Sequence, residues 1–198
     1  YIGALSSIKP HQYSLSLNLR WAFNGGYVGL ISWFLGNIDQ NWITITSREV
    51  LKYNHTFKDA YNTLSTTSLV SPIYFILAGV NPYEGVIITR DRNASLYPKF
   101  LDNSSWFLVQ TNYDHWTSPP FFDDRRTPAE ICLNKIDSQY DLVLLAKERT
   151  SQLNAGDKSL VTEDNDKNTV ISLREIGEGK ISIKTVEDSA INKLRKMQ

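Results

Sequence analysis

The sequence predicts an α+β fold with an antiparallel sheet. Two observations carry this prediction. Four segments either alternate apolar and polar residues or are rich in β-branched and aromatic residues, and turns containing Asn, Pro or Gly separate the last three. Segments with helix start and stop signals lie between the first strand and these three. The 198 residues suffice for a domain with a real core.

The elements of the first half follow from local signals. Residues 13–19 alternate apolar and polar side chains, which predicts a half-buried strand. Residues 28–35 predict a short buried helix with a glycine stop, and residues 42–51 predict a second helix. Thr56 is the expected N-cap of a third helix over residues 56–64.

Further strands and one more helix complete the expected meander. Strands are predicted over residues 73–78, 85–90 and 106–111. Thr127, followed by Pro128, predicts the start of a helix. After about residue 137 the aromatic residues nearly vanish, and charged and amide residues dominate. Turns are expected at residues 165–168 and 177–180, and a short basic helix at residues 191–196.

Charge and hydropathy exclude two classes of protein. Lys plus Arg and Asp plus Glu both number 21, so no overall field attracts nucleic acid. The longest apolar run, residues 26–36, is much shorter than the roughly 20 residues of a membrane span. This run is therefore expected in the core. The chain begins with Tyr1 rather than Met, which predicts a processed, truncated or internally started product.

Three glycosylation sequons and a single cysteine are the residues that could indicate in which cellular compartment the protein resides. Asn54, Asn93 and Asn103 each begin a sequon in a polar setting that suits a glycosylated surface loop. Cys132 is the only cysteine, so it cannot form a disulfide within this chain. The residues leave open whether Cys132 is a buried structural thiol, a free thiol or half of a bridge to another chain.

Several familiar types of site find no support. The three histidines lack metal-ligand spacing, so neither a metal nor another cofactor is expected. Asp123 and Asp124 would point apart in an extended loop and precede two arginines, which favours ion pairing or capping over acid/base catalysis. The glycine-containing turn at residues 24–29 lacks the lysine and the spacing of a phosphate loop.

Residues 109–128, VQTNYDHWTSPPFFDDRRTP, hold the remaining candidate site. Asn112 stands at the end of a predicted strand, where an asparagine is usually a turn residue. An amide N–H fixed on a strand end is also a good donor to the oxyanion of an acyl-transfer intermediate. Arg125 follows about a dozen residues later. From the residues alone, both interpretations of Asn112 stay open.

Residues 1 to about 136 resemble the large, catalytic subunit of the acid ceramidases, which belong to the N-terminal nucleophile hydrolases. The stretches that carry the resemblance are LSLNLRWAFNGGYVGLISWFLG, SPIYFILAG, GVIITRDR, FLVQTNYDHW and FFDDRRTPAEICLN, in family order. The implied fold is a four-layer αββα sandwich, here incomplete at both ends. Residues 137–198 form a polar segment without a family match, which an alternative or divergent C-terminus would explain.

The resemblance implies roles for individual residues. Asn112 matches the asparagine that helps to hold the oxyanion, and Arg125 matches an arginine of the polar network in the active site. Asn18 matches a position near the second oxyanion donor. The family has an acidic residue at the position of Leu19. This departure is expected to change the local charge balance and self-processing.

The family nucleophile is a cysteine at the N-terminus that autocatalytic cleavage creates. The resemblance places this cysteine upstream of Tyr1, so no nucleophile is assigned within these residues. Cys132 matches the cysteine that bridges to the small subunit of the same precursor. The resemblance therefore favours the interchain disulfide over the buried thiol.

The implied activity is that of a lysosomal or secreted amidohydrolase that cleaves ceramide, N-acylsphingosine, into sphingosine and a fatty acid. One alternative within the enzyme class is hydrolysis of N-acylethanolamines. A second alternative is a catalytically silent product that binds a lipid or a partner, because the nucleophile lies elsewhere. Aromatic pairs such as Trp33 and Phe34 suit a mouth that accepts lipid tails or contacts a membrane or lipid carrier.

Overall fold

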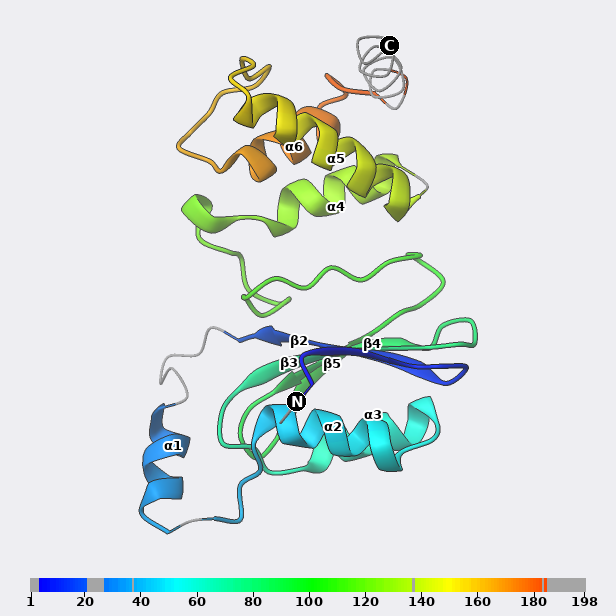
Figure 1. Ribbon diagram of the computed structural model, residues 1–198, viewed down its shortest axis with the longest axis vertical. Helices are drawn as coiled ribbons and strands as arrows, with labels where there is room; N and C mark the ends of the chain where they lie inside the picture. Colours follow the sequence, from blue (N-terminus) through cyan, green and yellow to red (C-terminus); the bar gives the residue numbers. More distant parts are fainter. Residues whose placement is uncertain (1–3, 21–26, 37, 137, 183, 185–198) are drawn as a thin grey trace, which may run out of the picture. The chain divides into compact units, whose positions relative to one another are not determined.

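The computed structural model describes residues 4–20, 27–36, 38–136, 138–182 and 184 (Figure 1). The chain divides into two compact units, Tyr1–Ser118 and Pro119–Gln198, and each is described by itself. The family resemblance runs on to about residue 136, and that boundary stays a prediction. The turn expected at residues 24–26 and the basic helix expected at residues 191–196 lie outside the described residues.

The first unit is built on one five-stranded antiparallel sheet. Its strands follow the chain in the order β1 (Ser6–Lys9), β2 (Tyr13–Leu19), β3 (Ile73–Gly79), β4 (Gly85–Arg90) and β5 (Ser95–Phe100). Leu15 of β2 pairs with Leu77 of β3, which pairs with Val86 of β4, so one face of the sheet is apolar. The antiparallel meander and the α+β class are confirmed.

Two helices, α2 (Ile43–Tyr53) and α3 (Phe57–Thr66), cover the apolar face of this sheet (Figure 1). They form one core with the strands, and its members include Val50, Ala60, Leu64, Leu15, Phe75 and Leu77. The hydroxyl of Thr56 accepts a hydrogen bond from the backbone N–H of Asp59 at 3.1 Å. This bond satisfies a free N–H of the first turn of α3, so the predicted N-cap is confirmed.

A buried arginine closes the other end of α3. Arg90, the last residue of β4, is completely buried. Its guanidinium donates to the carbonyl oxygens of Leu64 at 3.0 Å, Thr67 at 2.6 Å and Ser65. The positive charge therefore meets carbonyl groups that have no partner within the helix, at the negative end of its dipole.

The helix α1 (Tyr27–Phe34) forms as predicted, but its predicted burial is wrong. Tyr27 and Phe34 are 70% and 77% exposed, because none of the described elements covers these side chains. Gly29 alone is buried in this helix, and a Cβ there would lie 1.7 Å from the carbonyl oxygen of Val70. Gly36, with φ of 100°, follows the helix as the predicted stop.

The strand predicted over residues 106–111 is wrong. The fifth strand is instead β5, where Pro98 is tolerated because β5 is an edge strand. Residues 107–114 run along the face of the sheet opposite α2 and α3, where the side chain of Asn18 donates to the carbonyl of Gln110 at 3.3 Å. Side-chain contacts with the sheet face thus overrule the β propensity of this segment.

The second unit is helical, with a short 3-10 turn, η1 (Phe121–Asp123), followed by α4 (Arg126–Lys135), α5 (Gln139–Asn154) and α6 (Asn168–Gly177). The start of α4 is close to the prediction, but Asp124 rather than Thr127 provides the cap. One carboxylate oxygen of Asp124 accepts the backbone N–H groups of Arg126 and Thr127 at 3.1 and 3.0 Å. The segment after residue 137, for which only turns and a short basic helix were predicted, contains two helices.

The core of this helical unit explains how a polar segment can fold. Leu142, Leu145 and Ile176 pack around Cys132. Arg149 of α5 pairs with Glu175 of α6, which is completely buried, and its Nη2 lies 3.0 Å from Oε1 of Glu175. The same oxygen of Glu175 accepts the backbone N–H of Leu160 at 2.7 Å. One buried ion pair thus joins both helices and their connecting loop.

Candidate functional site

The two asparagines expected to hold an oxyanion lie side by side. Asn18 is near the end of β2, and Asn112 belongs to residues 107–114, which run along the face of the sheet. The Nδ2 atom of Asn112 donates to Oδ1 of Asn18 at 3.2 Å and to the carbonyl oxygen of Leu19 at 2.8 Å. The fold therefore joins two amide side chains that are 94 residues apart in the sequence.

An ionic cluster stands beside this asparagine pair. Arg20 donates to both carboxylate oxygens of Asp114, from Nε at 2.7 Å and from Nη2 at 2.8 Å. The hydroxyl of Tyr74 donates to Oδ1 of the same carboxylate at 2.6 Å. We refer to these three residues as the Asp114 clamp. Because Tyr74 belongs to β3 and Arg20 follows β2, the clamp fastens residues 107–114 to two strands.

The charges of the Asp114 clamp are mutually stabilised. Burial of Asp114 favours its neutral form, but the hydrogen bonds from Arg20 and Tyr74 outweigh this effect and hold its pKa below the usual value. Burial, then the hydrogen bond to Asp114, raises the pKa of Tyr74, and the same carboxylate raises the pKa of Arg20. The cluster is thus a charged, fixed support rather than a proton donor near neutral pH.

The sequence contained Asp114 within a motif but gave no sign of its partners. Arg20 is 94 residues away and Tyr74 is 40 residues away in the chain. No local spacing rule connects positions so far apart. The one sequence feature that could have indicated Asp114 is its position two residues after Asn112, in the stretch that holds the candidate site.

Arg125 lies in the second unit, whereas Asn18 and Asn112 lie in the first. Within its unit, the Nε atom of Arg125 is 3.0 Å from Oδ1 of Asp123, and Nη2 donates to Oδ2 at 3.1 Å. The ion-pairing and capping roles expected for Asp123 and Asp124 are confirmed by these contacts and by the cap of α4. The catalytic role of Arg125 stays a prediction.

Cys132 is completely buried in the core of the second unit. Its thiol lies 2.9 Å from the carbonyl oxygen of Leu173, to which it donates. Burial raises the pKa of this thiol to about 11, which makes it a poor nucleophile near neutral pH. The predicted interchain disulfide stays a prediction, and forming it requires that α4 and α6 separate locally.

The three sequon asparagines differ in their surroundings. Asn93 and Asn103 are exposed in loops next to β5. Asn54 is half-buried at the end of α2, and its Nδ2 atom donates to the hydroxyl of Thr63 at 2.9 Å. Glycan attachment replaces a hydrogen of this nitrogen, so the first two positions are better suited to modification.

Neither a metal cluster nor a membrane-spanning helix occurs in the part of the chain that the structure describes. Among residues 4–184, outside the gaps given above, no three His, Cys, Asp or Glu side chains gather to hold a metal ion. In the same part of the chain, no helix is long and apolar enough to cross a membrane.

The antiparallel sheet with helices on one face matches the fold of the N-terminal nucleophile amidohydrolases. A solved structure of this class, a Caenorhabditis elegans N-acylethanolamine-hydrolyzing acid amidase ortholog, matches the chain with a TM-score of 0.56 and 34% identity. The match covers 68% of this chain and 57% of that one. One sheet and its helical layer are described here, out of the four layers that were predicted.

Acid ceramidases are homologues of this chain. The identity is 47% over 141 residues with the protein of Pan troglodytes, 48% over 137 residues with that of Heterocephalus glaber and 46% over 141 residues with that of Homo sapiens. These matches cover about 70% of this chain but only 35 to 36% of each relative. The chain thus spans about a third of the length of the acid ceramidases that it matches. The resemblance to acid ceramidases, predicted from the sequence motifs, is confirmed.

A different family matches the second unit. The model of the RNA polymerase Rpb6 family matches residues 132–183, which include the last turn of α4 and all of α5 and α6. These residues lie almost entirely beyond the part similar to acid ceramidase. Two parts of one chain therefore resemble two different families.

Proposed function

We propose that the first part of this chain belongs to the catalytic portion of an amidohydrolase that cleaves N-acylsphingosine into sphingosine and a fatty acid. The observation that carries the proposal is the asparagine pair at the end of β2, at positions where the acid ceramidase resemblance implies oxyanion donors. The nucleophile is a cysteine at a processed N-terminus, outside these residues. No cofactor takes part.

The chemistry assigns a defined task to the amides. The cysteine thiolate adds to the substrate carbonyl, and the π electrons move to the oxygen, which becomes an oxyanion. An N–H of Asn112 then donates to this oxyanion in place of its longer bond, the 3.2 Å contact with Asn18. The C–N bond breaks as the amine takes a proton, and water hydrolyses the resulting thioester. The Asp114 clamp keeps the amides in position throughout.

The test is turnover of N-acylsphingosine by the native, fully processed protein and its variants. Asn112→Ala is expected to lower kcat about a hundredfold or more, the usual effect of losing one oxyanion donor. Asn62→Ala removes an exposed asparagine from α3 and serves as the matched control. Equal kcat values for wild type, Asn112→Ala and the control would remove Asn112 from the mechanism.

The related alternative is hydrolysis of N-acylethanolamines, the reaction in the name of the similar solved structure. Side-by-side turnover of the two lipids by the same preparation separates the reactions. The non-enzymatic alternative is a lipid- or partner-binding product without its nucleophile. Saturable ceramide binding without any turnover by the native protein would favour this last function.

The remaining assignments belong to the same proposal. Arg125 contributes to the polar network of the active site, and Cys132 bridges to a small subunit of the same precursor. The protein works in the lysosome or after secretion, and exposed aromatic residues such as Phe34 and Trp116 contact lipid tails, a membrane or a lipid carrier. Non-reducing mass spectrometry of the native protein tests the bridge directly.

A second candidate function concerns the second unit alone. The match of residues 132–183 to the RNA polymerase Rpb6 family supports a role for α4 to α6 as a polymerase-associated module. Co-purification of RNA polymerase subunits with the tagged full chain would support this function. Recovery of none of them, together with a lysosomal location, would leave the amidohydrolase as the function of the whole chain.

A further inference from the structure

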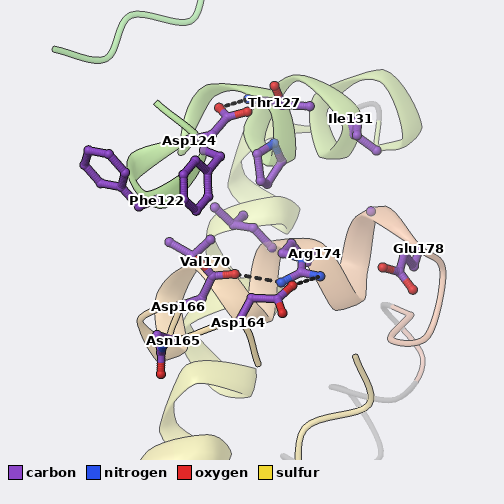
Figure 2. Close-up of a pocket in the computed structure, with 14 residues that line it drawn as sticks. Phe122, Asp124, Thr127, Ile131, Asp164, Asn165, Asp166, Val170, Arg174 and Glu178 are labelled. Carbon is purple, nitrogen blue, oxygen red and sulfur yellow. Dashed lines mark hydrogen bonds and ion pairs between the residues drawn. The ribbon is translucent and has the colours of Figure 1, made fainter. Parts of the chain in front are cut away.

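The second unit contains a groove of about 700 Å³ that neither proposed function uses (Figure 2). It lies between η1, the start of α4, the turn at residues 164–166 and α6. All of its lining residues belong to the second unit, so the groove is a property of this unit by itself. Its volume is within the range of about 300 to 1,000 Å³ that is typical of ligand sites.

The floor of the groove is apolar. Val170 and Leu173 lie three residues apart on α6, and Pro128 and Ile131 have the same spacing on α4, so each helix presents a row to the groove. Phe122 adds a large ring that is 73% exposed. Figure 2 shows the phenylalanine rings at one end of the groove and Glu178 at the other. Phe122 and Ile131, which is 43% exposed, give the groove an accessible apolar surface, and such a surface favours a partner that covers it.

The rim of the groove is acidic. Asp124, Asp164, Asp166 and Glu178 line it, against a single basic residue, Arg174. Arg174 pairs with Asp166 at 2.7 Å and approaches Asp164 at 3.7 Å, so it offsets the charge at one place only (Figure 2). The carboxylates come from three separate segments: the start of α4, the turn before α6 and the end of α6. Asp124 accepts two backbone N–H groups at the start of α4, so its charge is partly offset as well. The lining residues still carry a net negative charge, with four carboxylates against one guanidinium.

We propose that this groove is a docking site for a basic amphipathic peptide segment of a partner protein. Such a segment places an apolar stripe on the floor and cationic side chains against the rim at several points. An alkylamine offers an apolar chain but only one cation, so it would satisfy a single carboxylate. The separation of the carboxylates favours the peptide. This inference rests on neither amide hydrolysis nor polymerase association.

The test uses the full chain and a fluorescein-labelled helical peptide of Leu and Lys whose leucines lie on one face. A scrambled peptide of the same composition and an analogue with Glu in place of Lys are the ligand controls. Binding is followed by fluorescence anisotropy. The amphipathic Lys peptide is expected to bind about tenfold more tightly than either control, and its affinity should fall as salt is added.

Variants locate the binding in the groove. The double substitution Asp164→Asn with Glu178→Gln is expected to weaken binding about fivefold, and Phe122→Ser about tenfold, since each removes an exposed contact from the rim or the floor. Glu163→Gln and Tyr140→Ser change exposed residues of the same unit that do not line the groove, and should bind as wild type does. All five positions are at the surface, and circular dichroism verifies that each variant is folded.

Three results would overturn the proposal. Equal affinities for the amphipathic and scrambled peptides would mean that charge alone drives the association. Unchanged affinity in both groove variants would place the peptide elsewhere on the chain. Dodecylamine is the competing probe: if it alone binds, and with the same dependence on Phe122 and Glu178, the occupant is a cationic lipid and not a peptide.

Discussion

At the scale of single residues, the clearest lesson concerns Asp114. Its neighbour in sequence, Asn112, was marked as a site residue by the family resemblance, but the support beneath it is made by Arg20 and Tyr74. Such a cluster could not be predicted, because its members come together only when β2, β3 and the crossing segment assemble. The two asparagines, by contrast, could be predicted as site residues, because both lie in motifs that carry the family resemblance.

Replacement of Asp114 by Asn should destabilise the first unit by about 3 kcal/mol at neutral pH, because it leaves the Arg20 guanidinium without its charge partner. The folded-state pKa of Asp114 is lowered, so its stabilisation is complete above the ordinary carboxyl pKa of about 4 and is lost as pH falls through the lower folded value. The difference between wild type and variant should therefore shrink in acid.

The measurement is the free energy of unfolding in urea at several pH values. Asp39→Asn, at an exposed position of the same unit, is the matched control and should leave the free energy unchanged. A variant at Asp114 that loses the same stability at every pH would show that the carboxylate charge does not provide the stabilisation.

Glycan attachment is predicted to be selective. Asn93 and Asn103 should be modified in protein from a secretory host, whereas Asn54 should remain largely unmodified, because its amide is bonded to Thr63 and the sequon residue Thr56 caps α3. Peptide mass spectrometry after enzymatic deglycosylation in heavy water reads out each site. Full occupancy of Asn54 would mean that the glycan is added before the end of α2 folds.

At the scale of elements, strong local sequence patterns predicted the strands and helices correctly, and mixed patterns did not. The alternation of residues 13–19 and the apolar runs of β3 and β4 specify strands wherever they pack, so these were predicted correctly. The segment at 106–111 has β composition, yet the side chain of Asn18 donates to the backbone carbonyl of Gln110, and Asp114, just beyond the segment, binds Arg20. The helices α5 and α6 went unpredicted. In α5 the consecutive apolar residues 142–145 point to several faces, with Val143 and Leu144 exposed, so no clear helical period marks the helix.

Arg90 offers the sharpest test of how elements are joined. Arg90→Met should lower the free energy of unfolding by about 3 kcal/mol or more, because one buried and two partly buried carbonyl groups at the end of α3 lose their donor. Lys58→Met, an exposed change on the same helix, is the control. Equal stability of the two variants in urea unfolding would mean that water replaces the guanidinium at these carbonyls.

At the scale of the whole molecule, the chain joins residues similar to acid ceramidase to residues that match the RNA polymerase Rpb6 family. The first similarity was visible from motifs that keep their order along the chain. The second was not predicted, since a polar helical segment carries few distinctive residues. The change of composition near residue 137 predicted where the first similarity ends, and that boundary stays a prediction.

The 198 residues alone are predicted to show no amidase turnover, because the proposed nucleophile is outside them and Cys132 is buried with a raised pKa. Turnover is expected when the native protein, isolated from its source, carries a processed N-terminal cysteine. N-terminal sequencing and intact mass of that protein, alongside assays of both preparations, provide the measurement. Ceramide cleavage by the 198-residue chain would contradict the placement of the nucleophile.

The guanidinium of Arg90 also constrains the order of events during synthesis. The carbonyl of Leu64 is made 26 residues before the arginine that bonds it. The ribosome therefore releases the last turn of α3 well before its closing group. Until β4 has emerged and paired with β3, the carbonyl groups of that turn are open to water and the turn frays. The helix and the hairpin of β3 and β4 are therefore expected to become stable together, as a single folding unit.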